Sequence, residues 1–348
     1  MSQEQPYKFI DPADQRWLDF IALQNEANIF HHPAWISILA ECYGYRPFVV
    51  AVCDEKGEIT AGVPMMEVNS YLTGRRWISL PYSDHCCPLY QDEASLGQLV
   101  TCLELICSNQ VAPKIELRWD YSKNPAFSVQ QEYFLHTLRL EKSSEDLFTN
   151  VKKSFRQCVK QAQKKGVRIE RAEENEQFQQ FYRQMVTTRR QHGVPVQPRR
   201  FFDLLRTHAI NKGLGYLLCA YKDDRYLTSL LVLHWQETMT IKYNCSGIPK
   251  SDLQMRPNHL LYWTAICWGV ENGFTSVDMG RCSTSNTGLR DYKRRWGVQE
   301  EMLNYSYLSA GNGGKARGNL LPIMQTVIRR SPPIVCRLTG ELLYKHFA

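Results

Sequence analysis

The stretch that decides the fold lies in the second half of the chain. It runs Leu214-Gly-Tyr-Leu-Leu-Cys-Ala-Tyr221, then Lys222-Asp-Asp-Arg225, then Tyr226-Leu-Thr-Ser-Leu-Leu-Val-Leu-His-Trp235. Two apolar, β-rich runs around a short polar segment predict a hairpin, and 238–244 predicts a third strand. A helix then runs from Pro257 through Asn272, because Pro suits the first helical turn and Gly273 suits a stop. A short strand at 275–279 follows.

The same order of elements occurs twice. Two helices precede each hairpin, and a helix and a strand follow it. In the second half the leading helices are predicted at 176–191 and 199–211. In the first half we expect helices at 15–23 and from Pro33 through 42, a hairpin over 48–66, a helix at 96–110 and a strand at 114–119. This plan predicts an α/β (α+β) fold built from two similar halves.

Length and composition agree with a folded, two-domain protein. At about 150 residues per domain, 348 residues indicate two domains, and we expect bounds of 1–145 and 146–310 with a tail at 311–348. With 43% hydrophobic and 22% charged residues, the chain is not a disordered protein. No secretory signal and no apolar run near the ~20 residues of a membrane span are evident, so we expect a cytoplasmic protein.

The twelve cysteines contain no CxxC pair. Zinc sites need short paired spacings that bring four ligands together. Most of the cysteines stand among apolar residues, where a reduced thiol packs as a small hydrophobe. We therefore expect buried free thiols and no metal site.

Between the halves lies the most basic segment, 151–171, with eight Lys and Arg against Glu170 alone. Apolar residues recur at helical spacing, so residues 151–166 predict an amphipathic helix with a basic outer face that includes Arg156 and Lys160. A solvated face is one interpretation. The other is an anionic partner such as phosphates, tRNA or lipid headgroups, since a like-charged face repels itself.

The C-terminal tail is the second basic region. From Gly313 onward six Lys and Arg face one acid, which gives +5 of the chain's formal charge of +7. Two short apolar, basic segments, 320–328 and 334–343, flank Pro332-Pro333. They fit an interfacial anchor on an anionic membrane, and they equally fit a tail that docks on the protein's own core.

Three segments together carry a resemblance to a known family. They are Asn150-Val-Lys-Lys-Ser-Phe-Arg156 continuing to Arg168, Arg256-Pro-Asn-His-Leu-Leu-Tyr-Trp263 leading to Asp278-Met-Gly-Arg281, and Gly288-Leu-Arg-Asp-Tyr-Lys-Arg-Arg-Trp-Gly297. In order and spacing they resemble the Fem-type aminoacyltransferases of the GNAT superfamily, in particular the FemAB-like proteins of exopolysaccharide gene clusters and the lipid II:glycine glycyltransferase-like group. Phe30-His-His-Pro-Ala-Trp35 and Leu80-Pro-Tyr-Ser-Asp84 resemble the first half of that group.

The resemblance implies tandem GNAT-like domains and the transfer of an acyl or aminoacyl group to an amine of a cell-envelope glycan or peptidoglycan precursor. The donor would be aminoacyl-tRNA or acyl-CoA, with no permanently bound cofactor. The acceptor would be a glycan, a nucleotide-sugar or a lipid-linked precursor, and the protein would reach it by peripheral contact with the anionic inner membrane face. Such a transfer requires an amine that loses its proton and a stabilised oxyanion, which positioning and one or two charges can provide.

Lys293 is the foremost catalytic candidate. The Fem pattern has an aromatic residue followed by Lys at this place, and Tyr292-Lys293 matches it. Its ammonium group would offset the charge of a tRNA terminus or of the oxyanion. The alternative is that Lys293 and the arginines after it form a solvated basic loop. We expect K293M to abolish transfer with an unchanged melting temperature.

The other candidate site residues come from loops and helix ends. Asp84 and His85 are candidate general bases, although a structural turn also explains their segment. Arg281 and Ser283 follow a short strand, where a ligand can bind a sheet edge, although Arg281 equally suits a structural pair with Asp278. Arg256 and Asn258 open a helix and are candidate phosphate ligands, while Arg156 and Lys160 are candidate donor ligands.

Two other functions remain open from the sequence. Acyl-CoA enzymes of the GNAT superfamily usually hold the pyrophosphate with a glycine-rich loop. The corresponding segment, Met255-Arg-Pro-Asn-His259, has no glycine, which weakens an acyl-CoA-dependent N-acetyltransferase acting on an amino sugar but leaves it possible. The second alternative is a non-enzymatic protein that binds tRNA or anionic lipid through its basic segments.

Overall fold

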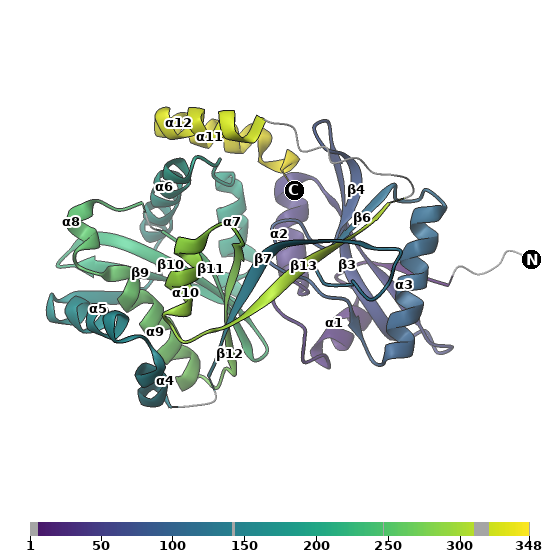
Figure 1. Ribbon diagram of the computed structural model, residues 1–348, viewed down its shortest axis with the longest axis horizontal. Helices are drawn as coiled ribbons and strands as arrows, with labels where there is room; N and C mark the ends of the chain where they lie inside the picture. Colours follow the sequence, from purple (N-terminus) through teal and green to yellow (C-terminus); the bar gives the residue numbers. More distant parts are fainter. Residues whose placement is uncertain (1–5, 141–142, 246, 310–319, 348) are drawn as a thin grey trace, which may run out of the picture. The chain divides into compact units, whose positions relative to one another are not determined.

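The computed structural model describes residues 6–140, 143–245, 247–309 and 320–347 (Figure 1). The chain divides into two compact units. The first unit consists of Met1–Tyr133, Met302–Arg317 and Lys345–Ala348, and the second of Phe134–Glu301 and Gly318–Tyr344. The domain bounds expected from the sequence, 1–145, 146–310 and 311–348, stay predictions.

The first unit is built on a mostly antiparallel sheet. Its elements are β1 (Lys8–Ile10), α1 (Gln15–Ala22), α2 (Pro33–Tyr43), β2 (Arg46–Cys53), β3 (Ile59–Ser70), β4 (Gly74–Ile78), β5 (Leu89–Tyr90), α3 (Glu93–Ser108) and β6 (Lys114–Leu117). The strand order is β1-β2-β3-β4-β6, with β5 beside β3. The pairing of β4 with β6 is parallel, and residues Ser306–Ser309 pair antiparallel with β6.

Both faces of this sheet are covered, because β2 and β3 are apolar on both sides. Phe48, Val50 and Val52 pack with Leu99 and Leu103 of α3 in one core cluster. The helices α1 and α2 contact β3 and β2 and contribute the fully buried Trp17 and Trp35, among others. Two-sided burial explains the continuous apolar runs of the strands.

The second unit has the same kind of plan. Its elements are β7 (Ser128–Arg139), α4 (Ser144–Asn150), α5 (Lys153–Lys164), β8 (Val167–Arg171), α6 (Asn175–His192), α7 (Arg199–His208), β9 (Gly215–Lys222), β10 (Arg225–Trp235), β11 (Thr238–Asn244), α8 (Lys250–Leu253), α9 (Pro257–Glu271), β12 (Ser276–Ser283), α10 (Thr287–Arg294), β13 (Gln299–Ser309), α11 (Leu320–Arg330) and α12 (Pro333–Leu343). The strand order is β7-β12-β11-β10-β9-β8. The strands β7 and β13 each contribute residues to both units.

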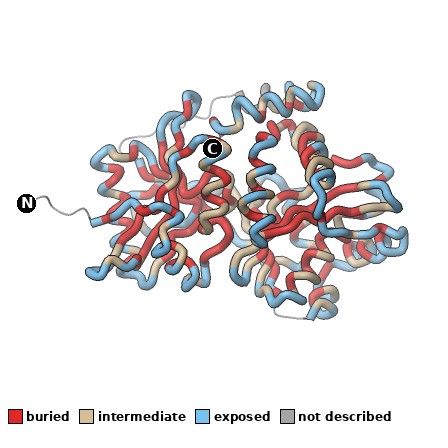
Figure 2. Tube along the Cα trace, turned by 180° about the vertical axis from the view of Figure 1, so that it is seen from behind, coloured by how far each residue is buried: buried red, intermediate tan, exposed pale blue. Residues whose placement is uncertain are grey.

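Helices cover both faces of the second sheet. The helices α5 and α9 pack on β8, β9 and β10 and bury one core cluster, which includes Phe155, Leu261 and Val232. On α6 and α7, Phe181 and Phe202 form an aromatic group with Tyr243 of β11. Figure 2 shows buried residues along the strands and exposed ones on the outer helix faces.

The predicted fold class is confirmed, and most predicted elements occupy the expected ranges. Gly166 and Gly273 take the left-handed conformation expected after a helix. Several elements were not expected, among them β7, α10 and β13. Within the described residues, no helix is long and apolar enough to cross a membrane.

Candidate active site

The strands β11 and β12 lie side by side over only part of their length. They pair in parallel at Thr238–Thr240 and Ser276–Asp278, and no pairing between them follows. Directly after Ile241 the register of β11 on β10 shifts, because Val232 pairs with Ile241 whereas Leu231 pairs with Tyr243. One extra residue, Lys242, therefore forms a bulge, and a bulge bends its strand. In open sheets, ligands bind where the carboxyl ends of parallel strands diverge.

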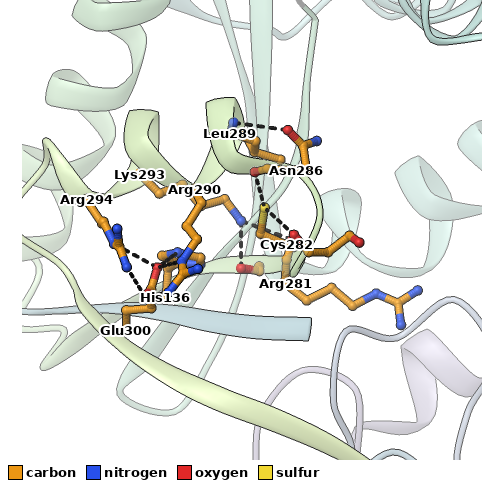
Figure 3. A network of polar contacts seen from close by, with 11 residues as sticks. His136, Arg281, Cys282, Asn286, Leu289, Arg290, Lys293, Arg294 and Glu300 are labelled. Carbon is orange, nitrogen blue, oxygen red and sulfur yellow. Dashed lines mark hydrogen bonds and ion pairs between the residues drawn. The ribbon is translucent and has the colours of Figure 1, made fainter. Parts of the chain in front are cut away.

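Lys293 reaches β12 from α10. The side chain of Asn286 caps this helix by accepting a hydrogen bond from the Leu289 N–H at 3.1 Å. One turn later, Lys293 points back to β12 (Figure 3). Its Nζ donates to the carbonyl oxygen of Gly280 at 2.7 Å and to that of Arg281 at 3.1 Å. The residue is only 4% exposed, so the prediction that it belongs to a solvated basic loop is wrong.

The backbone of β12 is shaped to present these two carbonyls. Gly280 has a φ of 74°, in the left-handed region that favours glycine. Its N–H donates to Oδ1 of Asp278 at 2.6 Å. The left-handed residue turns the strand where pairing with β11 has ended. Lys293 therefore places a buried positive charge at the diverging strand ends.

A second group of charges lies beside Lys293 and centres on Glu300 of β13. Its carboxylate accepts two hydrogen bonds from Arg290, at 2.6 and 2.7 Å, and two from Arg294, at 2.5 and 3.0 Å. Nε2 of His136, on β7, lies 3.0 Å from Oε2 of Glu300. These hydrogen bonds, led by those of Arg290, lower the pKa of Glu300 to about 2.

The site carries net positive charge. Burial lowers the pKa of His136, and the nearby Lys293 charge lowers it further, so the imidazole is neutral near pH 7. The cations Lys293, Arg290 and Arg294 outnumber the carboxylates of Glu300 and Asp278 by one, so one positive charge remains. Such a site favours an anionic ligand or a negative charge that develops during a reaction.

Three further predicted site residues, Arg281, Ser283 and Tyr292, lie near Lys293 but do not join its charge network. The side chain of Arg281 points away from Lys293 and Glu300 (Figure 3). The Ser283 hydroxyl lies 2.9 Å from that of Ser285 in the turn before α10. The ring of Tyr292 packs against Phe155, 5.1 Å between centroids. Burial raises the pKa of Tyr292 well above its usual value, which makes it a poor proton donor or acceptor.

Arg256 and Asn258 stand at the start of α9. Arg256 is exposed and takes a φ of 59°, which is unusual for a residue other than glycine. The Oδ1 atom of Asn258 accepts from Nδ2 of Asn244, at the end of β11, at 3.2 Å. Asn258 therefore ties α9 to β11 near the diverging strands, and Arg256 presents its guanidinium group to solvent.

Arg156 and Lys160 lie on α5, as predicted. Lys160 is exposed on the basic outer face, while Phe155 and Val159 are buried. The Nε atom of Arg156 is buried and has no hydrogen-bond partner among the described residues. The helix is tied to the residue after α10, because the Lys152 N–H donates to the Arg295 carbonyl at 2.9 Å. The basic helix and α10 thus belong to one corner of the second unit.

Asp84 and His85 belong to the first unit, whereas Lys293 belongs to the second. Their segment is an ordered turn in which Leu80 and Tyr82 have positive φ. The Asp84 carbonyl accepts from the Tyr305 hydroxyl at 2.6 Å. The structural turn that the sequence also allowed is therefore present, and a role for either residue as general base stays a prediction.

Sequence reasoning missed His136, Arg290 and Glu300. His136 lies on a strand that was not expected, and its ring is fully buried. The sequence signal that could have identified Glu300 is its place as the first acid after the basic run 293–295, with four residues between them. Among the described residues, no group of three or more His, Cys, Asp and Glu could hold a metal ion, and all twelve cysteines are free thiols.

Comparisons with known proteins agree with this fold. Residues 149–294 match the family described as Acetyltransferase (GNAT) domain. A search of curated proteins finds no significant match. Among solved structures, FemX is 13% identical with a TM-score of 0.67, and the match covers 92% of this chain and 99% of FemX.

Two further structures have the same fold. L-PGS from Bacillus licheniformis is 13% identical with a TM-score of 0.55, and the match covers 92% of this chain and 99% of L-PGS. A tandem GNAT protein from the clavulanic acid biosynthesis pathway is 10% identical with a TM-score of 0.53, over 88% and 100% of the two chains. Residues 149–294 therefore match the GNAT acetyltransferase domain, and the chain has a FemX-like tandem GNAT fold, as the resemblance of its sequence predicted.

Proposed function

We propose that the protein is an N-acyl or aminoacyltransferase that forms an amide on an amine of a cell-envelope glycan or peptidoglycan precursor. The observation that carries this proposal is the Lys293 ammonium group, buried on the carbonyls of Gly280 and Arg281 where β11 and β12 diverge. The GNAT match over residues 149–294, which includes Lys293, supports it.

The proposed reaction joins a donor ester or thioester to the acceptor amine. The amine nitrogen attacks the carbonyl carbon, and the electron pair of the C=O bond moves to oxygen. When this oxyanion collapses, the ester oxygen or thioester sulfur leaves with its bonding pair. The proton that the amine nitrogen loses is taken up by this leaving group, which departs as an alcohol or a thiol. The positive charge of Lys293, supported by Arg290 and Arg294, stabilises the oxyanion or the polyanionic donor. The basic face of α5 would hold donor phosphates.

A second candidate is an acyl-CoA-dependent N-acetyltransferase acting on an amino sugar. Two observations favour it. The matched family is described as an acetyltransferase, and Arg256 is exposed at the first turn of α9, whose N–H groups favour a phosphate. The two candidates use the same site and differ in the donor.

The test is a transfer assay with labelled acetyl-CoA and with aminoacylated tRNA, each supplied with an amino sugar or a nucleotide-linked muropeptide. We expect one pair to give amide product, with K293M at least about 100-fold slower, the usual cost of losing one oxyanion donor. K56M, a change on an exposed turn, is the matched control and should keep full activity. An active K293M protein that remains folded would remove Lys293 from the mechanism.

Binding measurements separate the donors. Saturable acetyl-CoA binding at micromolar affinity would favour the acetyltransferase. Selective retention of a charged tRNA at moderate salt would favour the aminoacyltransferase. Binding to any polyanion, lost steeply as salt rises and without product formation, would indicate the non-enzymatic alternative.

A further inference from the structure

The inner face of the C-terminal tail is part of the second unit. The helices α11 and α12 pack on α6 (Figure 1). Ile328 and Cys336 are 1% and 0% exposed, and Nε of Arg190 on α6 donates to the Ser331 carbonyl at 2.5 Å. At Gly340 the helix approaches the chain so closely that a β-carbon would collide with the Val196 carbonyl oxygen. The tail is docked on its own unit through small residues.

The outer face of α12 carries the large apolar side chains. Ile334, Leu338 and Leu342 are 51%, 52% and 68% exposed and recur every four residues, which places them in one stripe on the helix. Val327 of α11 is 51% exposed as well. A helix that served only to cover its own core would have the opposite arrangement, with the large residues inside. An exposed apolar stripe of this kind marks an interaction surface.

Basic residues surround this stripe. Arg330 and Arg337 are exposed on the tail, and Arg183 of α6 and Arg199 of α7 lie next to α12. The acids in the same place are fewer. Glu341 accepts a hydrogen bond from the Arg199 backbone at 3.0 Å, and Asp203 lies 3.8 Å from the Arg199 guanidinium group. Four arginines against two carboxylates leave a net positive charge beside the apolar stripe.

A groove of about 310 Å³ opens at this place between α6, α7 and α12, and Arg183, Arg199, Arg337 and Ile334 are among its lining residues. Tyr182 also lines it and is 8% exposed. The Tyr182 hydroxyl is buried and has no hydrogen-bond partner among the described residues. A buried hydroxyl without a partner loses free energy unless a ligand supplies one. Three guanidinium groups, one hydroxyl and apolar walls fit an anionic headgroup with its acyl chain.

We propose that the outer face of α12 docks on a lipid bilayer that contains anionic phospholipid. The stripe of Ile334, Leu338 and Leu342 enters the interface between headgroups and acyl chains, and the groove holds a headgroup phosphate on Arg183, Arg199 and Arg337. Apolar insertion combined with basic residues is the chemistry of interfacial helices. This inference goes beyond the proposed function, because neither Lys293 nor the transfer reaction enters it.

A second copy of the chain is a less suitable occupant. In a two-fold symmetric contact the same patch meets itself. The arginines around α12 would then face arginines, and like charges at an interface oppose association. An anionic bilayer matches both the apolar and the basic residues of this surface.

The test is co-sedimentation of the full-length protein with vesicles of phosphatidylcholine alone or with 30% phosphatidylglycerol. We expect binding to the anionic vesicles only. The triple variant I334S/L338S/L342S and the double variant R199Q/R337Q should each weaken it at least tenfold. All five substituted residues are exposed, so the variants should fold. L105S, at an exposed leucine of α3, and K212Q are matched controls and should bind like the wild type.

Three outcomes would overturn the proposal. They are equal binding to neutral vesicles, unchanged binding by both variants, and a dimer in light scattering that the triple variant abolishes. Inorganic phosphate at millimolar concentration should not release the protein, whereas full release would mean that the groove binds free phosphate and not a membrane. K293M should bind vesicles like the wild type, so a failure here is separate from a failure of the proposed function.

Discussion

The two units place a buried cation at the same point of the same kind of plan. Each contains a parallel pair of strands, β4 with β6 in the first and β11 with β12 in the second. Arg118, directly after β6, is 5% exposed and donates to the Ser83 carbonyl at 2.7 Å. Lys293 is 4% exposed and donates to two carbonyls of β12. Both cations close a turn by binding backbone oxygens.

The difference lies in what surrounds each cation. Nε of Arg118 also contacts Glu116 at 3.3 Å. Burial lowers the pKa of the nearby Arg76, and the charge of Glu116 offsets part of that lowering. In the second unit the local carboxylate, Glu300, contacts the outer arginines and His136. The first arrangement is suited to holding a turn in place. The second brings three cations together where β11 and β12 diverge, so burial alone does not distinguish a structural cation from a candidate catalytic one.

The sharpest test of this comparison crosses two variants. R118M removes a buried guanidinium group and leaves the partly buried Glu116 and the Ser83 carbonyl without their contacts. It should cost up to about 3–5 kcal/mol of unfolding free energy, the usual cost of breaking a buried pair. K293M leaves two carbonyls without donors and should cost about 1–3 kcal/mol. The expectation from the sequence of an unchanged melting temperature is therefore replaced by a lower one. Urea unfolding followed by circular dichroism measures both.

In activity, the two variants should rank the other way, with K293M losing more than R118M. R118M, assayed at a temperature where it is folded, should retain transfer far better than K293M. If R118M lost activity as completely as K293M while folded, the two cations would have equivalent roles and the contrast between the units would fail. K293R should recover part of the activity, because the positive charge remains but the guanidinium group is larger.

The second prediction concerns the tail of the second unit. G340A adds a β-carbon where the Val196 carbonyl lies, and the helix must move, at a cost of about 1–3 kcal/mol. G97A, in α3 of the first unit, has open space around its β-carbon and should be neutral or slightly stabilising, since alanine favours a helix. Thermal unfolding measures both. Equal melting temperatures for the two variants would mean that α12 is not held against residues 194–196.

Much of the fold followed from the sequence because apolar periodicity and turn residues are local signals. The β9–β10 hairpin, the left-handed glycines and the basic helix α5 were all predicted in place. The strands β7 and β13 were not, because their neighbours in the sheet are remote in sequence. The helix α10 was interpreted as a loop, since in Thr287–Arg294 its single buried residue is a lysine, and a helix without an apolar face has no visible period.

The candidate site was less predictable for the same reason. Lys293 was found through a resemblance to a family pattern, whereas its two carbonyl partners depend on the left-handed backbone at Gly280. Glu300 and His136 come from β13 and β7, and only tertiary structure brings them to α10. The bulge at Lys242, which separates β11 from β12, has no sequence signature. A charge network assembled from four elements cannot be inferred from any one of them.

The third prediction concerns the loss of stability at acid pH, and it is the same for both units. Burial lowers the pKa of His31 in the first unit and of His259 in the second to about 4. Each stays neutral in the fold while the unfolded chain takes up a proton below about pH 6.5. Stability is therefore complete above pH 6.5 and falls toward pH 4, by about 1.4 kcal/mol per pH unit for each proton. H31Q and H259Q should each reduce this slope by about one proton, measured by urea unfolding at pH 7.5 and 5.

A histidine whose substitution left the slope unchanged would be protonated equally in the folded and the unfolded chain. The expectation that the folded protein keeps the imidazole neutral is best supported for His31. Its Nε2–H donates to the Cys87 carbonyl at 2.9 Å, and its Nδ1 accepts from the Asn28 N–H at 3.2 Å. A second proton would place two donors against each other at Nδ1. The outcome for His259, which contacts aromatic rings and lies near the Arg256 charge, decides whether the second unit follows the same rule.

The smallest expected effect distinguishes the units again and concerns Glu300. Its pKa of about 2 in the fold lies below the ordinary value near 4.5, so its contribution is complete above pH 4.5 and is lost as the pH falls toward 2. E300Q should lower the melting temperature at pH 7 by about 2–4 °C, which corresponds to roughly 1 kcal/mol in a unit of this size. E301Q, an exposed neighbour, is the matched control.

Salt shows what kind of interaction E300Q removes. Without the carboxylate, Arg290, Arg294 and Lys293 repel one another, and salt screens repulsion between partly exposed charges. The difference in melting temperature between E300Q and the wild type should therefore become smaller at 1 M salt. It should also become smaller below pH 3, as the wild-type carboxylate takes up its proton. If the difference in melting temperature changed with neither salt nor pH, Glu300 would hold the arginines by geometry alone. The excess positive charge assigned to the second unit would then have no energetic consequence, and the contrast with Glu116 in the first unit would be one of position only.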